Sequence, residues 1–234
     1  ICGPNSKKIL NKIIPDLDLS EENFPHMSFK NTEIGNIKCR IMRISFTGEH
    51  SYEINVQANY GRAIWEKCME AGKEFNITPY GTETMHLLRA EKGFIIVGQD
   101  TDGSVTPYDL NMDWIVSKKK EDFLGKRSFS REDTSRNDRK KLVGLLVNDK
   151  TTVLPEGSHV VEKAKSQPPM KMLGHVSSSY YSPTNDHPIA LAMLKDGISR
   201  MGDEVEIPLM NGKIIKATVT DTIFYDKEGL INNE

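Results

Sequence analysis

Six short β-like runs divide the C-terminal part of the sequence, and this division constrains the fold more than any other feature. Turn-forming pairs such as Asp196-Gly197 and Asn211-Gly212 separate the runs, which span residues 142–147, 159–162, 172–179, 189–194, 204–208 and 213–220. Short strands at such intervals, punctuated by glycine, proline and asparagine, are typical of antiparallel barrels and sandwiches. We therefore expect an all-β domain, a barrel or a sandwich, over residues 141–234.

Residues 79–116 precede this region and combine a helix with charged side chains in apolar surroundings. Thr82, after a proline–glycine turn, predicts the start of the helix, and Gly93 predicts its end. Arg89 and Glu91 fall among apolar residues of this helix, where an unpaired buried charge costs several kcal/mol. Both are therefore expected to be paired, and a salt-bridged helix end is favoured over a functional site.

After the helix, the sequence predicts a loop and then a strand. Residues 99–103 are polar and end in glycine, which indicates an exposed loop. Residues 113–116 are expected to begin a strand that carries Trp114, because a tryptophan is too large to leave on the surface without reason.

The N-terminal part predicts helices packed on a sheet. Helical spacing of apolar residues covers 7–14 and 62–75, and β-like composition covers 24–56, with runs at 39–46 and 52–56. Turns are expected at Gly35-Asn36 and Gly48-Glu49. The buried face of the second helix is expected to carry Ile64, Trp65, Cys68 and Met69. The polar stretch 118–140 is expected to be a linker between domains.

Composition excludes several classes of function. A formal net charge of −2 gives no strong basic field, so nucleic-acid binding is not expected, and Lys118–Lys120 is favoured as a solvated face over a polyanion site. No apolar run is long enough to cross a membrane and the N-terminus does not resemble a signal peptide, so we expect a cytoplasmic protein. A chain that opens on Ile1 is expected to be part of a longer protein.

Cysteine and histidine spacing predicts neither a disulfide framework nor a metal site. The cysteines are odd in number, widely spaced and form no C-x-x-C pair, so small buried thiols are expected at Cys2, Cys39 and Cys68. His175 is the histidine of greatest interest, although a hydrogen-bonded histidine in a sheet is the favoured interpretation.

Glu53 is the more informative polar residue. In the segment Thr-Gly-Glu-His-Ser-Tyr-Glu-Ile, residues 47–54, a tight turn is followed by an apolar strand, and Glu53 lies at the start of that strand. A carboxylate there needs hydrogen-bond donors. The donors can come from the protein itself, through the backbone or an arginine, or they can come from a pair of N–H groups on a ligand.

Long motifs give the sequence a resemblance to a known family. TGEHSYEI, PYGTETMHLLRAEKGF, GQDTDGSVTP and FLGKRS resemble the aminomethyltransferase family, which includes the T-protein of the glycine cleavage system, over essentially the whole chain. LPEGSHVVE, MLGHVSSSYYSP and FYDKEG are similar to the α subunits of heterotetrameric sarcosine oxidases within it. We expect an α+β fold, a ferredoxin-like antiparallel sheet with helices over residues 1–117, then the linker 118–140 and a β-barrel over 141–234.

The resemblance implies a tetrahydrofolate site and five contact residues. Glu53 occupies the position that accepts hydrogen bonds from the pterin N3–H and amino group. Phe46 stands where the family usually has a tyrosine, and Met85 where the T-proteins have an arginine that meets the folate tail. Phe94 and Tyr225 correspond to further aromatic positions of the site.

The implied function is the tetrahydrofolate-binding portion of a sarcosine oxidase α subunit, which supports oxidative demethylation of sarcosine to glycine with one-carbon transfer to 5,10-methylenetetrahydrofolate. The family's catalytic aspartate precedes the position of Ile1, so no catalytic residue is expected here, and the chain alone is expected to bind folate poorly and to lack activity. Flavins and NAD are expected elsewhere in the complex, and β, γ and δ subunits are the expected partners. The alternatives are an aminomethyltransferase, disfavoured by Met85, and a non-catalytic folate-binding or subunit-docking fragment.

Overall fold

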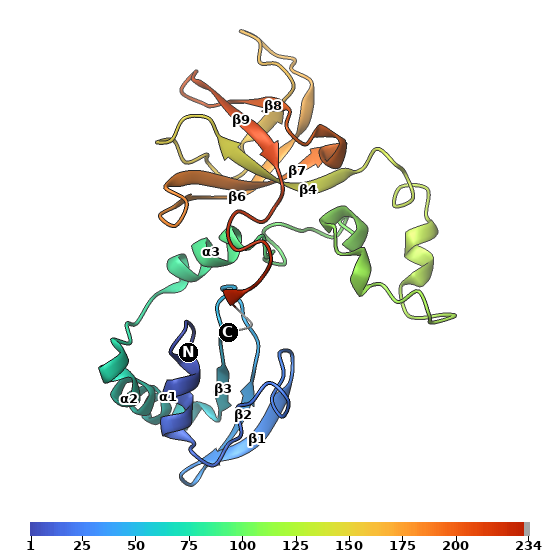
Figure 1. Ribbon diagram of the computed structural model, residues 1–234. Helices are drawn as coiled ribbons and strands as arrows, with labels where there is room; N and C mark the ends of the chain where they lie inside the picture. The colour runs from blue at the N-terminus through green and yellow to red at the C-terminus, as the bar shows by residue number, and fades with distance from the viewer. Residues whose placement is uncertain (232–234) are drawn as a thin grey trace. The chain divides into compact units, whose positions relative to one another are not determined.

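The computed structural model describes residues 1–231 and divides into two compact units (Figure 1). Among the described residues, the first unit comprises 1–88 and 228–231, and the second comprises 89–227. The α-helices are α1 (Ser6–Ile13), α2 (Gly61–Gly72) and α3 (Thr82–Glu91). Among residues 1–231, no helix has the length and apolar character needed to cross a bilayer. The domain boundaries expected from the sequence remain a prediction.

A three-stranded antiparallel sheet forms the first unit together with two helices. Its strands are β1 (Phe29–Ile34), β2 (Ile37–Met42) and β3 (Glu53–Val56), in the spatial order β1-β2-β3. Gly35-Asn36 makes the predicted two-residue turn between β1 and β2, with Gly35 at φ +62°. Burial alternates along the strands, so one face of the sheet is covered and the other is open to solvent.

The helices α1 and α2 contribute to the core on the covered face. Leu10 of α1 and Ile64 and Cys68 of α2 pack in one apolar cluster with Cys39 and Ile41 of the sheet. This arrangement confirms the predicted α+β character of the N-terminal part.

Two details of this unit differ from expectation. Trp65, predicted on the buried face of α2, is 56% exposed. The buried face of the helix carries Ile64 and Cys68, and the Trp65 side chain lies to one side of that face. The strand predicted to reach Phe46 ends at Met42, since the chain leaves the sheet there for a series of bends.

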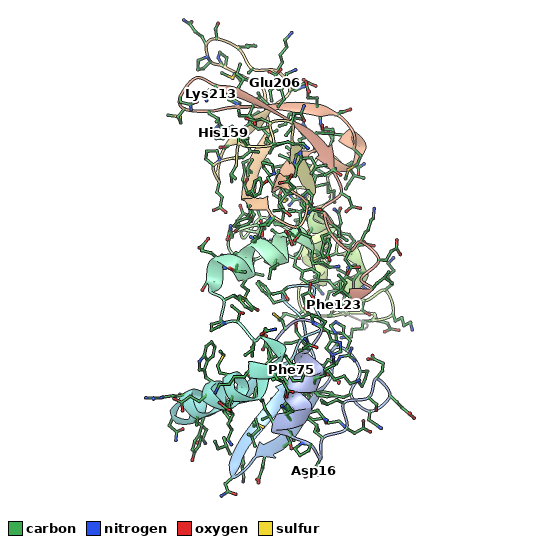
Figure 2. The ribbon with its side chains drawn as sticks, turned by 60° about the vertical axis from the view of Figure 1, so that its left-hand side comes forward. Asp16, Phe75, Phe123, His159, Glu206 and Lys213 are labelled. Atoms are coloured by element: carbon green, nitrogen blue, oxygen red, sulfur yellow. The ribbon has the colours of Figure 1, made fainter. Side chains whose placement is uncertain are left out.

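The second unit contains a closed β-barrel, which resolves the choice between barrel and sandwich. Its strands are β4 (Lys140–Val147), β5 (His159–Val161), β6 (Met172–Ser182), β7 (His187–Lys195), β8 (Glu204–Pro208) and β9 (Ile214–Thr220), in the order β4-β7-β6-β5-β8-β9. Each strand matches one of the predicted runs. In Figure 2, His159 and Glu206 mark the neighbouring strands β5 and β8. Val, Leu, Ile and Ala side chains from all six strands fill the interior.

The end of α3 matches the sequence prediction, whereas the segment after it does not. Gly93 follows the helix at φ +69°, and a Cβ there would lie 2.6 Å from the Thr222 carbonyl oxygen, so the position requires glycine. Residues Asp113–Ile115 form a short 3₁₀-helix instead of a strand, and Trp114 is 75% exposed. The size of the tryptophan side chain was therefore a poor guide to its burial.

Candidate functional site

Glu53 lies at the first position of β3, on the edge of the sheet and on its solvent face. Its neighbours Ile54 and Val56 point to the opposite face and pack against the core. No side-chain or backbone donor among residues 1–231 hydrogen-bonds to the Glu53 carboxylate, which is exposed. The protein therefore leaves both carboxylate oxygens of Glu53 available to a ligand.

A cavity of about 880 Å³ opens beside Glu53 within the first unit. Its walls come from the start of the chain, β3, α2 and residues 75–80, and Phe75 is labelled in Figure 2. The apolar part of the lining includes Ile9, Ile54, Ile64, Trp65, Met69, Phe75 and Leu88. A cavity of this size and character suits a flat, largely apolar ligand with a polar edge.

Cys2 and Tyr80 add a polar pair to the same cavity. The Cys2 Sγ lies 3.0 Å from the Tyr80 hydroxyl oxygen. Burial, and then the contact with Cys2, raises the pKa of the Tyr80 phenol, so the hydroxyl stays protonated at neutral pH and can donate a hydrogen bond. Cys39 and Cys68 are buried as predicted, but Cys2 is half-buried, because it lines a cavity and not the core.

The structure brings only one of the predicted contact residues to this cavity. Phe46 lies in the bends after β2 and is 37% exposed, and Met85 lies half-buried in α3; neither lines the cavity with Glu53. Phe94 and Tyr225 belong to the second unit. The sequence did not predict that Trp65, Tyr80 and Cys2 line this cavity. The one signal available for such a role was an aromatic residue, Trp65, next to the buried Ile64.

A buried ion pair organises the start of the second unit. Arg89 and Asp100 have side chains with no exposed surface, and an Arg89 Nη donates to the Asp100 carboxylate over 2.6 Å. Asp100 also accepts hydrogen bonds from the Ser177 and Ser178 hydroxyls and from the backbone N–H of Ile96. The predicted pairing of Arg89 is confirmed. The expectation of an exposed loop at 99–103 holds for Asp102 and Gly103 but not for Asp100, which turns inward to meet the arginine.

Glu91 and Lys92 each have a partner of their own in the same region. The Ser182 hydroxyl donates to the Glu91 carboxylate over 2.5 Å, and the Lys92 ammonium lies 2.9 Å from the carboxylate of Asp226. Glu91 is only 2% exposed and is hydrogen-bonded as expected, but its partners are the hydroxyls of Ser182 and Thr184 and not a cation, so no salt bridge among residues 1–231 forms at this residue. These pairs fasten the last turn of α3 to the barrel strand β6 and to the segment after β9.

The same helix end positions Phe94 and Tyr225. An Arg89 Nη donates to the Phe94 carbonyl over 3.0 Å, and the Tyr225 N–H donates to the Glu91 carbonyl over 3.1 Å. Phe94 is 39% exposed and Tyr225 is half-buried. The end of α3 thus fixes the backbone of two of the predicted contact residues, and Phe94 remains partly exposed.

His175 lies in β6, half-buried, with His159 and Met193 opposite it on the neighbouring strands. Burial, and then the charge of Lys140, lowers the pKa of His175, so the ring is neutral at neutral pH. Its ring forms no hydrogen bond with other residues in the described range 1–231. Within that range, no group of three or more His, Cys, Asp or Glu side chains is arranged to hold a metal ion.

Together these features define a class of protein in which a small α+β unit precedes a closed six-stranded barrel. The model of the GCVT N-terminal domain matches residues 1–120, and the model of the glycine cleavage T-protein C-terminal barrel domain matches residues 140–226. The chain belongs to the glycine cleavage T-protein family.

Two named relatives are similar to almost the whole chain. Sarcosine oxidase subunit alpha from Corynebacterium sp. strain P-1 is 49% identical over 232 residues, which are 98% of this chain and 24% of that protein. Aminomethyltransferase from Thermoanaerobacter sp. strain X514 is 32% identical over 228 residues, which are 97% of this chain and 59% of that protein. The chain therefore spans about a quarter of the sarcosine oxidase relative's length.

A solved structure supports the fold. The glycine cleavage system aminomethyltransferase T from Bartonella henselae superimposes with a TM-score of 0.71 at 24% identity, covering 85% of this chain and 52% of that one. The predicted fold class is confirmed.

Proposed function

We propose that this chain is the tetrahydrofolate-binding portion of a sarcosine oxidase α subunit, in which it supports oxidative demethylation of sarcosine to glycine with transfer of the one-carbon unit to 5,10-methylenetetrahydrofolate. Membership of the T-protein family and 49% identity to a protein named sarcosine oxidase subunit alpha support this proposal. The observation that carries it is the carboxylate of Glu53, which lines a large cavity and has no hydrogen-bond donor within residues 1–231.

The chemistry of Glu53 suits the edge of a pterin. A pterin presents a ring N–H and an amino group side by side, and a carboxylate presents two oxygens at a matching spacing. Hydrogen bonds to an ionised acceptor are about twice as strong as those between neutral groups. Trp65 and Tyr80 can pack against the flat ring, since both have an apolar body and a polar tip.

The other contact residues are assigned apolar or aromatic roles. Phe46 and Phe94 would pack against folate without the hydroxyl of a tyrosine, and Met85 would contact it through a soft thioether in place of an ionic bond. Tyr225 completes the proposed set. When bound, tetrahydrofolate supplies the nitrogens that accept the one-carbon unit, and the role of these side chains is to hold and orient it.

Assembly with other chains follows from the same proposal. The relatives at 49% and 37% identity are both named as a subunit, which supports partners for this chain. We assign those partners to the β, γ and δ subunits of the oxidase, with the flavin and NAD chemistry on other parts of the complex.

An aminomethyltransferase is the second candidate, favoured by relatives of that name at 32% identity. The replacement of an arginine by Met85 argues against it. Supplying the complete protein with sarcosine in one assay and with an aminomethylated carrier protein in another separates the two, because each candidate predicts product in one assay only.

The main test follows the fate of the one-carbon unit. The complete protein, turning over sarcosine with tetrahydrofolate present, is expected to yield methylenetetrahydrofolate, and Glu53→Gln is expected to shift the product toward free formaldehyde. Quantifying both products by chromatography measures the shift. An unchanged product ratio in a folded Glu53→Gln protein would remove Glu53 from the site.

A further inference from the structure

A second cavity, of about 740 Å³, lies along α1 in the first unit and is distinct from the one that contains Glu53. Lys7 and Lys8 line it at the start of the helix, and residues 15–20 line it at the other end. His50, from the bends before β3, also contributes to the wall. None of these residues belongs to the proposed set of folate contacts.

The start of α1 leaves backbone donors unused. Asn5 is at the N-cap position but makes no side-chain hydrogen bond to the helix, and the first turn carries no Asp or Glu. The backbone N–H groups of Lys7 and Lys8 have no acceptor among residues 1–231. Free N–H groups at the positive end of a helix dipole attract an anion.

Two lysines in the first turn of α1 add to this positive charge. The Lys8 ammonium donates to the Asn5 side-chain oxygen over 3.1 Å, whereas the Lys7 ammonium has no hydrogen-bond or ion-pair partner among residues 1–231. Cations are unfavourable at a helix N-terminus, because they face the positive end of the dipole. An anion bound at this turn would therefore be attracted by both lysines and would offset their mutual repulsion.

His50 supplies a buried polar atom without a partner. The residue is 5% exposed, and its Nε2 lies 3.1 Å from the Tyr52 hydroxyl oxygen. Its Nδ1 is buried and has no hydrogen-bond partner among residues 1–231. Tyr52 is not one of the described residues that line this cavity, so the Nε2 edge of the ring is turned away from the cavity and the Nδ1 edge is left to face it.

Hydrogen bonding at the His50 ring indicates that Nδ1 carries the proton. Burial, and then the charges of Arg43 and Lys7, lowers the pKa of His50, so the ring is neutral and has one N–H group. A proton on Nε2 would leave both the Tyr52 hydroxyl hydrogen and the Nδ1 lone pair buried without a partner. A proton on Nδ1 lets the Tyr52 hydroxyl donate to Nε2 and leaves a single unpaired donor. The second arrangement is favoured, because buried polar groups are rarely left unpaired.

The carboxylates of the cavity lie at its other end. Asp16 and Asp18 follow the helix, whose eight residues span about 12 Å, so they lie beyond the distance at which salt screens exposed charges. Asp16 is labelled in Figure 2. Glu21, whose charge also acts on His50, is paired with Arg43. The first turn of α1 is therefore the cationic end of the cavity.

We propose that the first turn of α1, with Lys7, Lys8 and the Nδ1–H of His50, binds the phosphate group of a small ligand. A phosphate group has three strong acceptor oxygens, which suit three kinds of donor: backbone N–H groups, ammonium groups and an imidazole N–H. The remaining volume, with Leu17 and Leu19 in its lining, leaves room for the organic part of a phosphate ester. This site is independent of the proposed folate site.

The test measures binding of inorganic phosphate and of phenyl phosphate to the complete protein by calorimetry in a phosphate-free buffer. Asn5→Asp is the main variant, because its carboxylate would occupy the free N–H groups of the first turn and repel the ligand. An aspartate at the N-cap also stabilises a helix, so a loss of binding in this variant cannot come from unfolding. Lys7→Ala removes an exposed cation of the site, and Lys67→Ala, on the exposed surface of α2, is its matched control.

Asn5→Asp is expected to weaken phosphate binding tenfold or more, on the order of the loss of one or two charge-assisted hydrogen bonds, and Lys7→Ala severalfold. His50→Phe, which keeps a ring but removes the N–H donor, is also expected to weaken it, with the urea midpoint as the check on folding. Lys67→Ala is expected to match the parent protein. Phosphate bound elsewhere in the complete protein is common to parent and variants, so the difference between them reports this cavity.

Equal affinity of the parent protein and Asn5→Asp for both probes would overturn the inference, as would an equal loss in Lys7→Ala and Lys67→Ala. The two probes also identify the source of the phosphate. Tighter binding of phenyl phosphate than of inorganic phosphate, lost in Asn5→Asp, would assign the site to a phosphate ester. Equal binding of the two, lost in the same variant, would assign it to free phosphate.

Discussion

Glu53 in the first unit and Asp100 in the second are both carboxylates next to apolar segments, yet the protein treats them in opposite ways. Asp100 has no exposed side-chain surface and accepts hydrogen bonds from Arg89, Ser177, Ser178 and the Ile96 backbone. Glu53 is exposed beside a cavity and receives no donor from residues 1–231. A carboxylate whose acceptor sites are filled by the protein serves the fold, whereas an unfilled one is available to a ligand.

The surrounding backbone creates this difference. Asp100 belongs to a loop that returns to β6, whose consecutive serines at 177 and 178 point hydroxyls at it. Glu53 starts an edge strand whose one neighbour in the sheet, within residues 1–231, is β2, and the residue opposite Glu53 on β2 is Met42, whose side chain has no donor. The comparison predicts that changes at Asp100 affect stability and changes at Glu53 affect binding.

Among the variants that test this comparison, Asp100→Ala is expected to have the largest effect on stability. It leaves the fully buried guanidinium of Arg89 without its counter-charge, and breaking a buried pair in this way costs about 3–5 kcal/mol of unfolding free energy. Urea denaturation of the complete protein, followed by circular dichroism, measures the loss.

Asp102→Ala provides the control for that experiment. Asp102 lies in the same loop but is exposed and is hydrogen-bonded to Ser104, so its loss is expected to cost about 1 kcal/mol or less. Similar losses for the two variants would show that the Arg89 pair contributes no more than a surface turn.

Glu53→Ala tests the other side of the comparison. Loss of a charge-assisted pair of hydrogen bonds is expected to weaken tetrahydrofolate binding by about 1.5–3 kcal/mol, a tenfold to hundredfold rise in Kd. The urea midpoint is expected to stay within the error of the parent protein, because the carboxylate has no partner in the fold. Glu22→Ala, another exposed carboxylate of the first unit, is the calorimetric control.

Local patterns were sufficient to predict most of the fold. The six barrel strands and the end of α3 at Gly93 follow from turn residues and apolar spacing within short windows, and the need to pair a buried Arg89 follows from the cost of burying a charge. Trp65 and Trp114 were misplaced because the exposure of a large side chain depends on which elements pack over it, and the sequence of one helix or loop does not contain that information.

The site was less predictable, for a related reason. Glu53 stood out because its turn and strand are adjacent in sequence. The partner of Arg89 was missed although the arginine required one, because Asp100 is in a loop whose composition indicates solvent exposure. Tyr80 meets Cys2 in the cavity wall, and the two residues are 78 positions apart in the sequence, so this neighbourhood is not visible before the chain is folded.

Phe94→Ala tests in a binding experiment whether the loop after α3 takes part in folate binding, as opposed to the barrel strand β6 of the same unit. Removing the ring is expected to weaken tetrahydrofolate binding by about 0.5–1.5 kcal/mol, the contribution of a stacking aromatic side chain. His175→Ala, on β6, is expected to have a smaller effect. If the histidine variant alone lost binding in calorimetry, the site would have to be moved to the barrel.

The smallest expected effect concerns acid sensitivity, and it comes from His50 in the first unit. His50 is 5% exposed, and burial, followed by the charges of Arg43 and Lys7, lowers its pKa below the ordinary 6.5. The unfolded chain therefore takes up a proton near pH 6.5 while the folded chain does not, so stability that is fully present above pH 6.5 is lost as the pH falls through the folded-state pKa. Urea midpoints are expected to fall between about pH 7.5 and pH 5.5, and to fall less in His50→Gln, whose amide can still meet the Tyr52 hydroxyl. An identical fall in parent and variant would assign the acid sensitivity to His26 or His175, whose pKa values burial also lowers.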